Sequence, residues 1–259
     1  MKNILNKAVA IIAISAALTS CSSDEVAISG TGNLDLEFDN SYGENDLLLN
    51  SQSYTTSNNE ALKISTLKYI VSNIVLTKED GTTYTYPKSQ SYFIIDESDS
   101  EKRVAGLVDV PAGNYTKVTF GIGVDKTQWE LGASGQGDFL ATAQAAGMMW
   151  SWTAGYKFMA FEGSFTSPTV TTATDFKVHT GQTGTDYNYT EVTLTLPTNA
   201  MVRTTITPEI HIVADASKII DGTNKFKLSE SATIMGGSSL ALITANLINM
   251  FSVAHVHND

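Results

Sequence analysis

Short segments in which apolar and polar residues alternate recur along most of this chain, and they limit its fold more than any other feature. Leu34-Asp35-Leu36-Glu37-Phe38-Asp39 is a clear case, with its apolar residues on even numbers. A period of two is that of a β-strand with one buried face. About ten such segments follow at short intervals, with few helical patterns and no internal repeat. This spacing predicts an all-β protein, an antiparallel β-sandwich of the immunoglobulin-like or jelly-roll-like kind.

Other elements are expected further along the chain. Strands are predicted at Leu47–Leu49, Ala61–Thr77, Thr82–Tyr86, Tyr92–Asp96, Lys117–Asp125, Phe176–Gly181, Thr190–Leu196 and Thr205–Val213. Val108–Tyr115 is expected to be a strand followed by a turn at Pro111 and Gly113. Pro208 makes the last of these an edge strand or a strand that starts late. One short C-terminal helix is expected within Ser239–Phe251, where apolar residues recur at helical spacing. Trp129–Ala146 is the longest irregular stretch.

The stretch from Gly147 to Gly163 is unusually aromatic. If it is one strand, Trp150, Trp152, Tyr156 and Phe158 share a face. Each ring can bury about 150–250 Å², so such a face belongs at the centre of a core. The alternative is that a tryptophan here lines a metal or redox site, and the pattern alone does not choose between the two.

The N-terminus carries an export signal. Residues 1–20 combine a short basic region with an apolar run shorter than the about 20 residues that span a bilayer. The run ends in Leu18-Thr19-Ser20-Cys21, the form of a bacterial lipoprotein cleavage site. We therefore expect residues 1–20 to be a lipoprotein signal peptide, 21–33 a flexible tether lipidated at Cys21, and 34–259 a single domain. The alternative is an ordinary secretory signal with an incidental cysteine.

Charge and cysteine content exclude several classes of function. The net charge of −11 disfavours nucleic acid and anionic lipid as partners, and it attracts cations. Cys21 is the only cysteine, which leaves the domain no thiol for a disulfide or a Cys-ligated metal. Ser22-Ser23-Asp24-Glu25 resembles the acidic tag that sends some Bacteroidetes lipoproteins to the cell surface. The alternative is a solvated tether. The expected location is the outer membrane, on its periplasmic side or at the cell surface.

Four histidines are the candidate ligands. His255-Val256-His257 places two imidazoles on one side of an extended tail, and imidazole is the commonest ligand for copper, zinc or nickel. Terminal histidines are also often merely solvated. His179 is either a ligand or a hydrogen-bonded residue at a strand end, and His211 is expected to face solvent. No P-loop, GxSxG, HExxH or dinucleotide motif is present, so the sequence does not argue for an enzyme.

Several motifs in matching order resemble the MbnP family, exported copper-associated proteins named for a partner in methanobactin operons and abundant as lipoproteins in Bacteroidetes. The segments that carry the resemblance are Lys68–Ile74, Val110–Tyr115, Phe120–Asp125, Gly147–Gly163, Phe176–Gly181 and Met250–His257. The corresponding family patterns are YYISNI, V-P-A-G-x-Y, F-x-I-G-V-D, the G-M-x-W-x-W-x-x-G-Y block, F-x-x-H-x-G and M-F-x-V-x-H-V-H. The resemblance covers nearly the whole predicted domain.

The resemblance implies a β-sandwich that binds copper as Cu(I) or Cu(II), with zinc as a second candidate. Carried over by position, His179, His255 and His257 become the metal ligands. Trp150 or Trp152 becomes the tryptophan near the metal, which a diheme peroxidase-like partner oxidises to kynurenine in some members. A metal transporter is the other partner to consider. Asn40 stands where family members often have a histidine, which implies one nitrogen ligand fewer or weaker binding.

Two functions follow from these observations. The first is an exported lipoprotein that binds copper for acquisition, storage or hand-over. The second is a surface module that binds glycan or protein through exposed aromatic side chains such as Trp129 or Tyr156. Burial of Trp150 and Trp152 would argue against the second, and metal content after native purification would separate the two.

Overall fold

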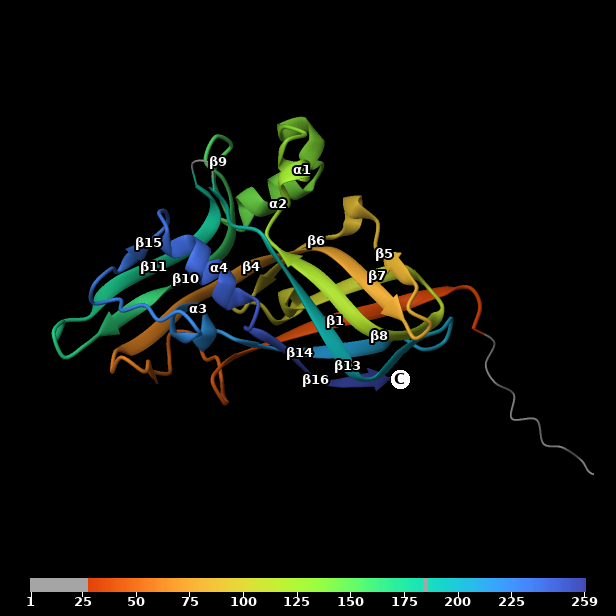
Figure 1. Cartoon of the computed structure of the whole chain (residues 1–259), viewed down its shortest axis with the longest axis horizontal. Coiled ribbons are helices and arrows are strands. Elements are labelled where there is room, and N and C mark those ends of the chain that lie inside the picture. Colours follow the sequence, from red (N-terminus) through yellow and green to blue (C-terminus); the bar gives the residue numbers. More distant parts are fainter. Residues whose placement is uncertain (1–27, 184–185) are drawn as a thin grey trace, which may run out of the picture.

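The computed structural model describes residues 28–183 and 186–259. Over these residues the chain forms two β-sheets that pack on a shared core, so the expected all-β sandwich is confirmed (Figure 1). The predicted signal peptide, Cys21 and the first part of the predicted tether lie outside the described residues. The first strand begins at Thr31, within the segment 21–33 that we expected to be tether.

The smaller sheet has five strands. Its order is β16 (Phe251–Asn258), β14 (Pro208–Asp215), β1 (Thr31–Tyr42) and β2 (Asn45–Asp46), and β7 (Val104–Pro111) also pairs with β1. The β1–β14 pair is parallel, whereas the others in this sheet are antiparallel. Pro208 is the first residue of β14, so the late start was correct and the edge position was not.

The larger sheet has eleven strands. Along its main path lie β12 (Asp186–Tyr187), β11 (Thr174–Thr183), β10 (Gly155–Thr166), β4 (Ala61–Lys78), β8 (Gly113–Ile122) and β13 (Thr190–Val202). Its shorter strands are β3 (Tyr54–Thr55), β5 (Thr83–Thr85), β6 (Tyr92–Asp96), β9 (Met149–Ser151) and β15 (Thr233–Ile234). The β11–β15 pair is parallel. The strand predicted at Leu47–Leu49 does not form. The preceding strand, β2, ends at Asp46.

Aromatic rings from both sheets meet in the core. Phe38 of β1 packs edge-on against Tyr69 of β4, Phe120 of β8 and Phe251 of β16, with ring centroids 5.5–6.2 Å apart. All four side chains are buried. The even-numbered apolar residues of β1 face this core, so the odd-numbered ones lie on the outer face of the smaller sheet.

The aromatic stretch is a hairpin, so its interpretation as one continuous strand was wrong. β9 ends at Ser151, the chain turns, and β10 begins at Gly155 with φ +84°. Such a positive φ suits glycine. Tyr156 and Phe158 are buried in a second, smaller cluster of apolar residues, whereas Trp150 and Trp152 are only half-buried.

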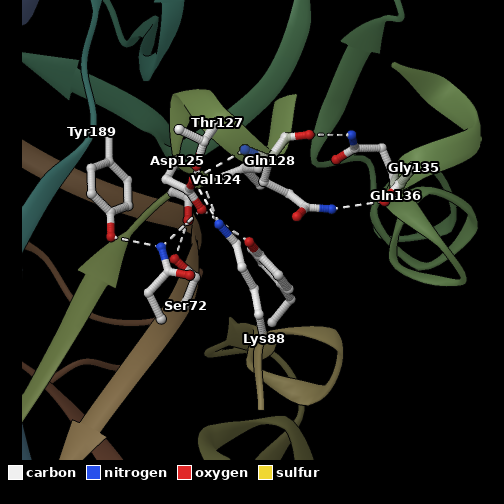
Figure 2. A network of polar contacts seen from close by, with 12 residues as sticks. Ser72, Lys88, Val124, Asp125, Thr127, Gln128, Gly135, Gln136 and Tyr189 are labelled. Carbon is white, nitrogen blue, oxygen red and sulfur yellow. Dashed lines mark hydrogen bonds and ion pairs between the residues drawn. The ribbon is translucent and has the colours of Figure 1, made fainter. Parts of the chain in front are cut away.

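The stretch from Trp129 to Ala146 is less irregular than expected. It belongs to an excursion that contains α1 (Lys126–Trp129), the 3₁₀ turn η3 (Ala133–Gln136) and α2 (Phe139–Ala145). Asp125 caps α1 by accepting a hydrogen bond from the Gln128 amide, and Gln136 donates to the Gln128 carbonyl (Figure 2). A polar network around Asp125 therefore fixes the base of this excursion.

The remaining helices are short. They are η1 (Lys88–Gln90), η2 (Ser100–Arg103), α3 (Ser217–Asp221) and α4 (Ser239–Leu247), the last being the predicted C-terminal helix. Within the described residues, no helix combines the length and apolar character needed to cross a membrane.

Candidate metal site

Three neighbouring strands of the smaller sheet place acidic and imidazole side chains in two rows on its outer face. In one row, Glu37 of β1 is the register partner of His211 of β14, which in turn pairs with His255 of β16. The next row runs through Asp35, Glu209 and His257 on the same three strands. Because side chains alternate along a strand, all six project from the same face.

A β-bulge in β16 turns its two histidines to this face. Ile212 pairs with Val253 but His211 pairs with His255, so Ala254 is an extra residue in β16. Val253 before the bulge and Val256 after it both pack against the core. Regular alternation would have placed His255 on the same side as Val253. The extra residue moves His255 and His257 to the opposite face of the sheet from Val253. Bulges beside functional sites often re-aim side chains in this way.

The three imidazoles of His211, His255 and His257 form a compact group, here called the histidine cluster. His211 stacks on His255 with ring centroids 4.2 Å apart, and His257 lies edge-on at 5.0 Å from His211 and 4.7 Å from His255. One ligand nitrogen from each can be chosen so that all lie within 4.8 Å of one another. His255 and His257 are exposed, so the cluster is open to solvent.

Two carboxylates adjoin the central imidazole. Glu37 Oε2 lies 2.6 Å from His211 Nδ1, and Glu209 Oε1 lies 2.6 Å from His211 Nε2. Nε2 is buried but makes no hydrogen bond, so the contact with Glu209 lacks hydrogen-bond geometry. Glu37, Glu209 and His211 also present ligand atoms within 4.8 Å of one another.

A third carboxylate, that of Asp35, adds negative charge beside this group. Burial, and then repulsion from Glu209, raise the pKa of Asp35 above its ordinary value. On its other side Asp35 pairs with Gly106 of β7, where an added Cβ would stand 3.2 Å from its carboxylate. A cation bound here would reduce the repulsion between Asp35 and Glu209.

The donor set fits a transition-metal ion. Imidazole nitrogens bind zinc or copper at about 2.0–2.1 Å, which places ligands around a tetrahedral ion about 3.4 Å apart. Nitrogens within 4.8 Å reach that spacing by small side-chain rotations. The buried Nε2 of His211, which lacks a hydrogen-bond partner, supplies a free electron pair for a metal. Imidazoles with carboxylates suit copper, zinc or nickel.

The structure does not bring His179 into this cluster. His179 lies on β11 of the larger sheet, nearly fully buried, and its Nε2 donates to Glu162 at 2.6 Å. Its Nδ1 is buried without a hydrogen-bond partner. Burial lowers the pKa of His179, although the hydrogen bond to Glu162 acts in the opposite direction. The predicted trio of His179, His255 and His257 is therefore divided between the two sheets.

The predicted tryptophans lie with His179 rather than with the cluster. The Trp150 ring is 6.0 Å from that of His179, whereas Trp152 stacks on Trp129 at 4.1 Å. Trp129 and Trp152 cover each other, and Tyr156 is buried. Tyr156 is therefore unavailable to a glycan, whereas the three half-buried tryptophans do not decide that alternative.

Asn40 is also remote from the outer face. It is buried on the core side of β1, where it donates to Glu97 at 2.9 Å and accepts from the Tyr69 hydroxyl at 2.9 Å. Asn40 and Glu37 are three residues apart in β1, so their side chains lie on opposite faces of the sheet. Asn40 is therefore not a ligand for a metal at the histidine cluster.

Sequence reasoning found two of the three clustered histidines and missed His211, Glu37 and Glu209. His211 was expected to face solvent, and it does lie on the outer face, but its side chain is only 21% exposed between two glutamates. One signal was available: Glu37, Glu209 and His211 all occupy polar positions of alternating strands. What the sequence lacked was the pairing of β1, β14 and β16.

Comparisons with known proteins agree with the resemblance noted in the sequence. A family model described as MbnP matches residues 31–236. The solved structure of MbnP from Methylosinus trichosporium is similar over 80% of this chain and 82% of that chain, with a TM-score of 0.51 and 14% sequence identity. At that identity the likeness shows a shared fold. No curated protein sequence matches the chain significantly.

Proposed function

The chain belongs to the MbnP family, and on that premise we propose that it is an exported lipoprotein that binds a transition-metal ion for acquisition, storage or hand-over. Copper is the first candidate and zinc the second. The observation that carries the proposal is the histidine cluster, His211, His255 and His257, with Glu37 and Glu209 beside it.

The proposal has two supports, the family and the cluster, and they overlap at the tail, because the resemblance in the sequence includes His255 and His257. The family match ends at residue 236, before His255 and His257, so it does not include two of the three imidazoles. The cluster follows instead from strand register and from the bulge at Ala254. Family membership points to a copper-related role, and the donor set points to a divalent or cuprous ion of the same chemical class.

In this proposal the metal is cargo, and the protein is not an enzyme. Strand positions hold the ligands on a rigid sheet, and two exposed imidazoles give a partner access to the ion. The acidic chain favours encounter with cations. The partners that we consider are a diheme peroxidase-like protein and a metal transporter.

The proposed location is the outer membrane, on its periplasmic side or at the cell surface. It rests on the cleavage-site form of Leu18–Cys21 and on the acidic residues that follow it. A lipidated Cys21 would anchor the domain to the membrane through the tether.

The test is metal titration of the mature chain with Cu(II), anaerobic Cu(I) and Zn(II). The double variant His255→Ala/His257→Ala is expected to lose more than the about 10–100-fold in affinity that loss of an outer-shell partner costs. His211→Ala should lose a similar amount. His179→Ala is the matched control, because it removes a buried histidine from the other sheet, and it should bind as the wild type does.

Equal affinity in the wild type and in both cluster variants would refute the proposal. Loss of binding only in His179→Ala would place the ion at His179 and Trp150 instead. Circular dichroism of each variant separates lost ligands from lost fold.

A further inference from the structure

We infer that Glu37 and Glu209 are metal ligands, and that they make the site selective for oxidised, divalent copper over cuprous copper. The inference rests on the proposed metal-binding function and deepens it by assigning the oxidation state of the ion. It starts from the contacts of one side chain, that of His211.

His211 stands between the two carboxylates, and one carboxylate oxygen lies close to each ring nitrogen. Both nitrogen–oxygen distances are 2.6 Å. An imidazole has one N–H when neutral and two when protonated, and each N–H donates only in hydrogen-bond geometry. The contact at Nε2 already lacks hydrogen-bond geometry. Hydrogen bonding to His211 therefore accounts for at most one of the two glutamates.

The second glutamate is explained if a metal ion takes part. His211 belongs to both groups whose ligand atoms converge, one with His255 and His257 and one with Glu37 and Glu209. An ion held by His211 is thus within reach of oxygen donors as well as nitrogen donors. Three imidazoles and a carboxylate, with the second carboxylate as a further donor, give a mixed nitrogen and oxygen shell.

The burial of these groups agrees with a role as ligands. The Glu37 side chain is 28% exposed and that of Glu209 is 36% exposed, so each has lost much of its contact with water. Asp35 adds a third carboxylate beside Glu209. No lysine or arginine forms an ion pair with Glu37, Glu209 or Asp35 among the described residues. A divalent cation would supply the compensating charge.

This mixed shell discriminates between the two oxidation states. Thiolate and thioether donors favour Cu(I), whereas tetragonal sites of nitrogen and oxygen donors are typical of Cu(II) and Ni(II). The groups that converge here are imidazoles and carboxylates, and the sequence after Cys21 has no cysteine to supply a thiolate. Anionic oxygen donors stabilise the doubly charged ion more than the singly charged one, because the attraction scales with charge.

The test is the double variant Glu37→Gln/Glu209→Gln in the mature chain, with Cu(II) or anaerobic Cu(I) as the probe. Cu(II) affinity is expected to fall by at least the about 10–100-fold that outer-shell changes cost, and Cu(I) affinity by a smaller factor because its charge is half as large. The Cu(II) electron paramagnetic resonance spectrum should also change. Glu162→Gln is the matched control, because Glu162 likewise contacts a histidine at 2.6 Å but lies in the other sheet, and it should leave both affinities unchanged.

Two outcomes would overturn the inference: unchanged affinity for both oxidation states, or an equal loss for both. Failure of the proposed function looks different, because the wild type itself would then bind neither ion at the cluster. If the double variant does not fold, wild-type protein carrying glutamate with ¹³C-labelled side-chain carboxylates gives a second measurement. Carboxylate coordination predicts a ¹³C hyperfine coupling to bound Cu(II), and its absence would also overturn the inference.

Discussion

Replacing Asp125 by alanine is expected to destabilise the excursion between β8 and β9 and to lower the melting temperature. The Asp125 carboxylate accepts hydrogen bonds from the Gln128 amide at 3.0 Å, from Asn73 at 2.9 Å and from the Tyr92 hydroxyl at 3.0 Å. It also accepts from Thr127 and Lys88 (Figure 2). Its side chain is only 15% exposed, so water does not easily replace these partners.

The magnitude follows from what the alanine leaves behind. Loss of the α1 cap costs about 1 kcal/mol. Asn73 and Tyr92 lose an acceptor, at about 1–3 kcal/mol for each donor left unsatisfied. Asn73 lies at the low end because it also donates to the Tyr189 hydroxyl. The total is about 3–5 kcal/mol, and at about 2–4 °C for each kcal/mol in a domain of this size the melting temperature falls by about 6–20 °C.

Calorimetry and limited proteolysis of Asp125→Ala measure the effect globally and in the excursion. Lys88→Met is the control: Lys88 is 45% exposed, so its ion pair with Asp125 contributes about 1 kcal/mol or less.

Burial alone would raise the pKa of Asp125, but hydrogen bonds led by Thr127 and Lys88 outweigh it and lower the pKa. The stabilisation is therefore present above the unfolded pKa of about 3.9 and is lost as the pH falls through the lower native value. A variant that melts and resists proteases as the wild type does, at neutral pH, would refute this account.

Three further predictions address other parts of the chain. Cys21→Ala should leave the protein unacylated and released from membranes, and retention in the membrane fraction would contradict the lipid anchor. Phe158→Ala should cost about 3–5 kcal/mol because its ring is buried, whereas Trp152→Ala should cost less because its ring is half-buried; equal losses in urea unfolding would contradict the hairpin geometry. Burial lowers the pKa of His179, so the free energy of unfolding should fall as the pH drops below about 6.5, the ordinary imidazole pKa, and should fall less in His179→Gln. The same pH dependence in both proteins would show that His179 is not the cause.

Strands whose alternation is regular could be predicted from the sequence almost to the residue. β6 matches its predicted range, and β1 and β4 extend theirs by a few residues at most. The local pattern of apolar residues was sufficient to place these strands, because their apolar side chains pack against the core. The prediction of one strand for the aromatic stretch failed because Trp150 and Trp152 continue the period of two across a turn. Gly155 was the available signal, since a positive φ marks where the chain reverses.

The histidine cluster was only half visible in the sequence, for a physical reason. That His255 and His257 share a face follows from alternation, but which face they share depends on the bulge at Ala254. A bulge is a property of two paired strands, and alanine carries no signal for one. His211 joins the cluster through pairing between β14 and β16, and Glu37 through the parallel pairing of β1 with β14. These contacts join the two ends of the chain, so local patterns do not contain them.

The position of the cluster links metal binding to the architecture of the smaller sheet. β16 lies at the edge of that sheet and pairs with β14 on one side only. An ion shared by His211 and the two histidines of β16 would connect the edge strand to its neighbour, and a Glu37 ligand would extend the connection to β1. Since a ligand that binds only the folded state adds to its stability, the ion would stabilise the pairing that creates its own site. The core faces of these strands are apolar, so the ion would sit on the opposite face from the packing that joins the two sheets, and a partner could reach it there.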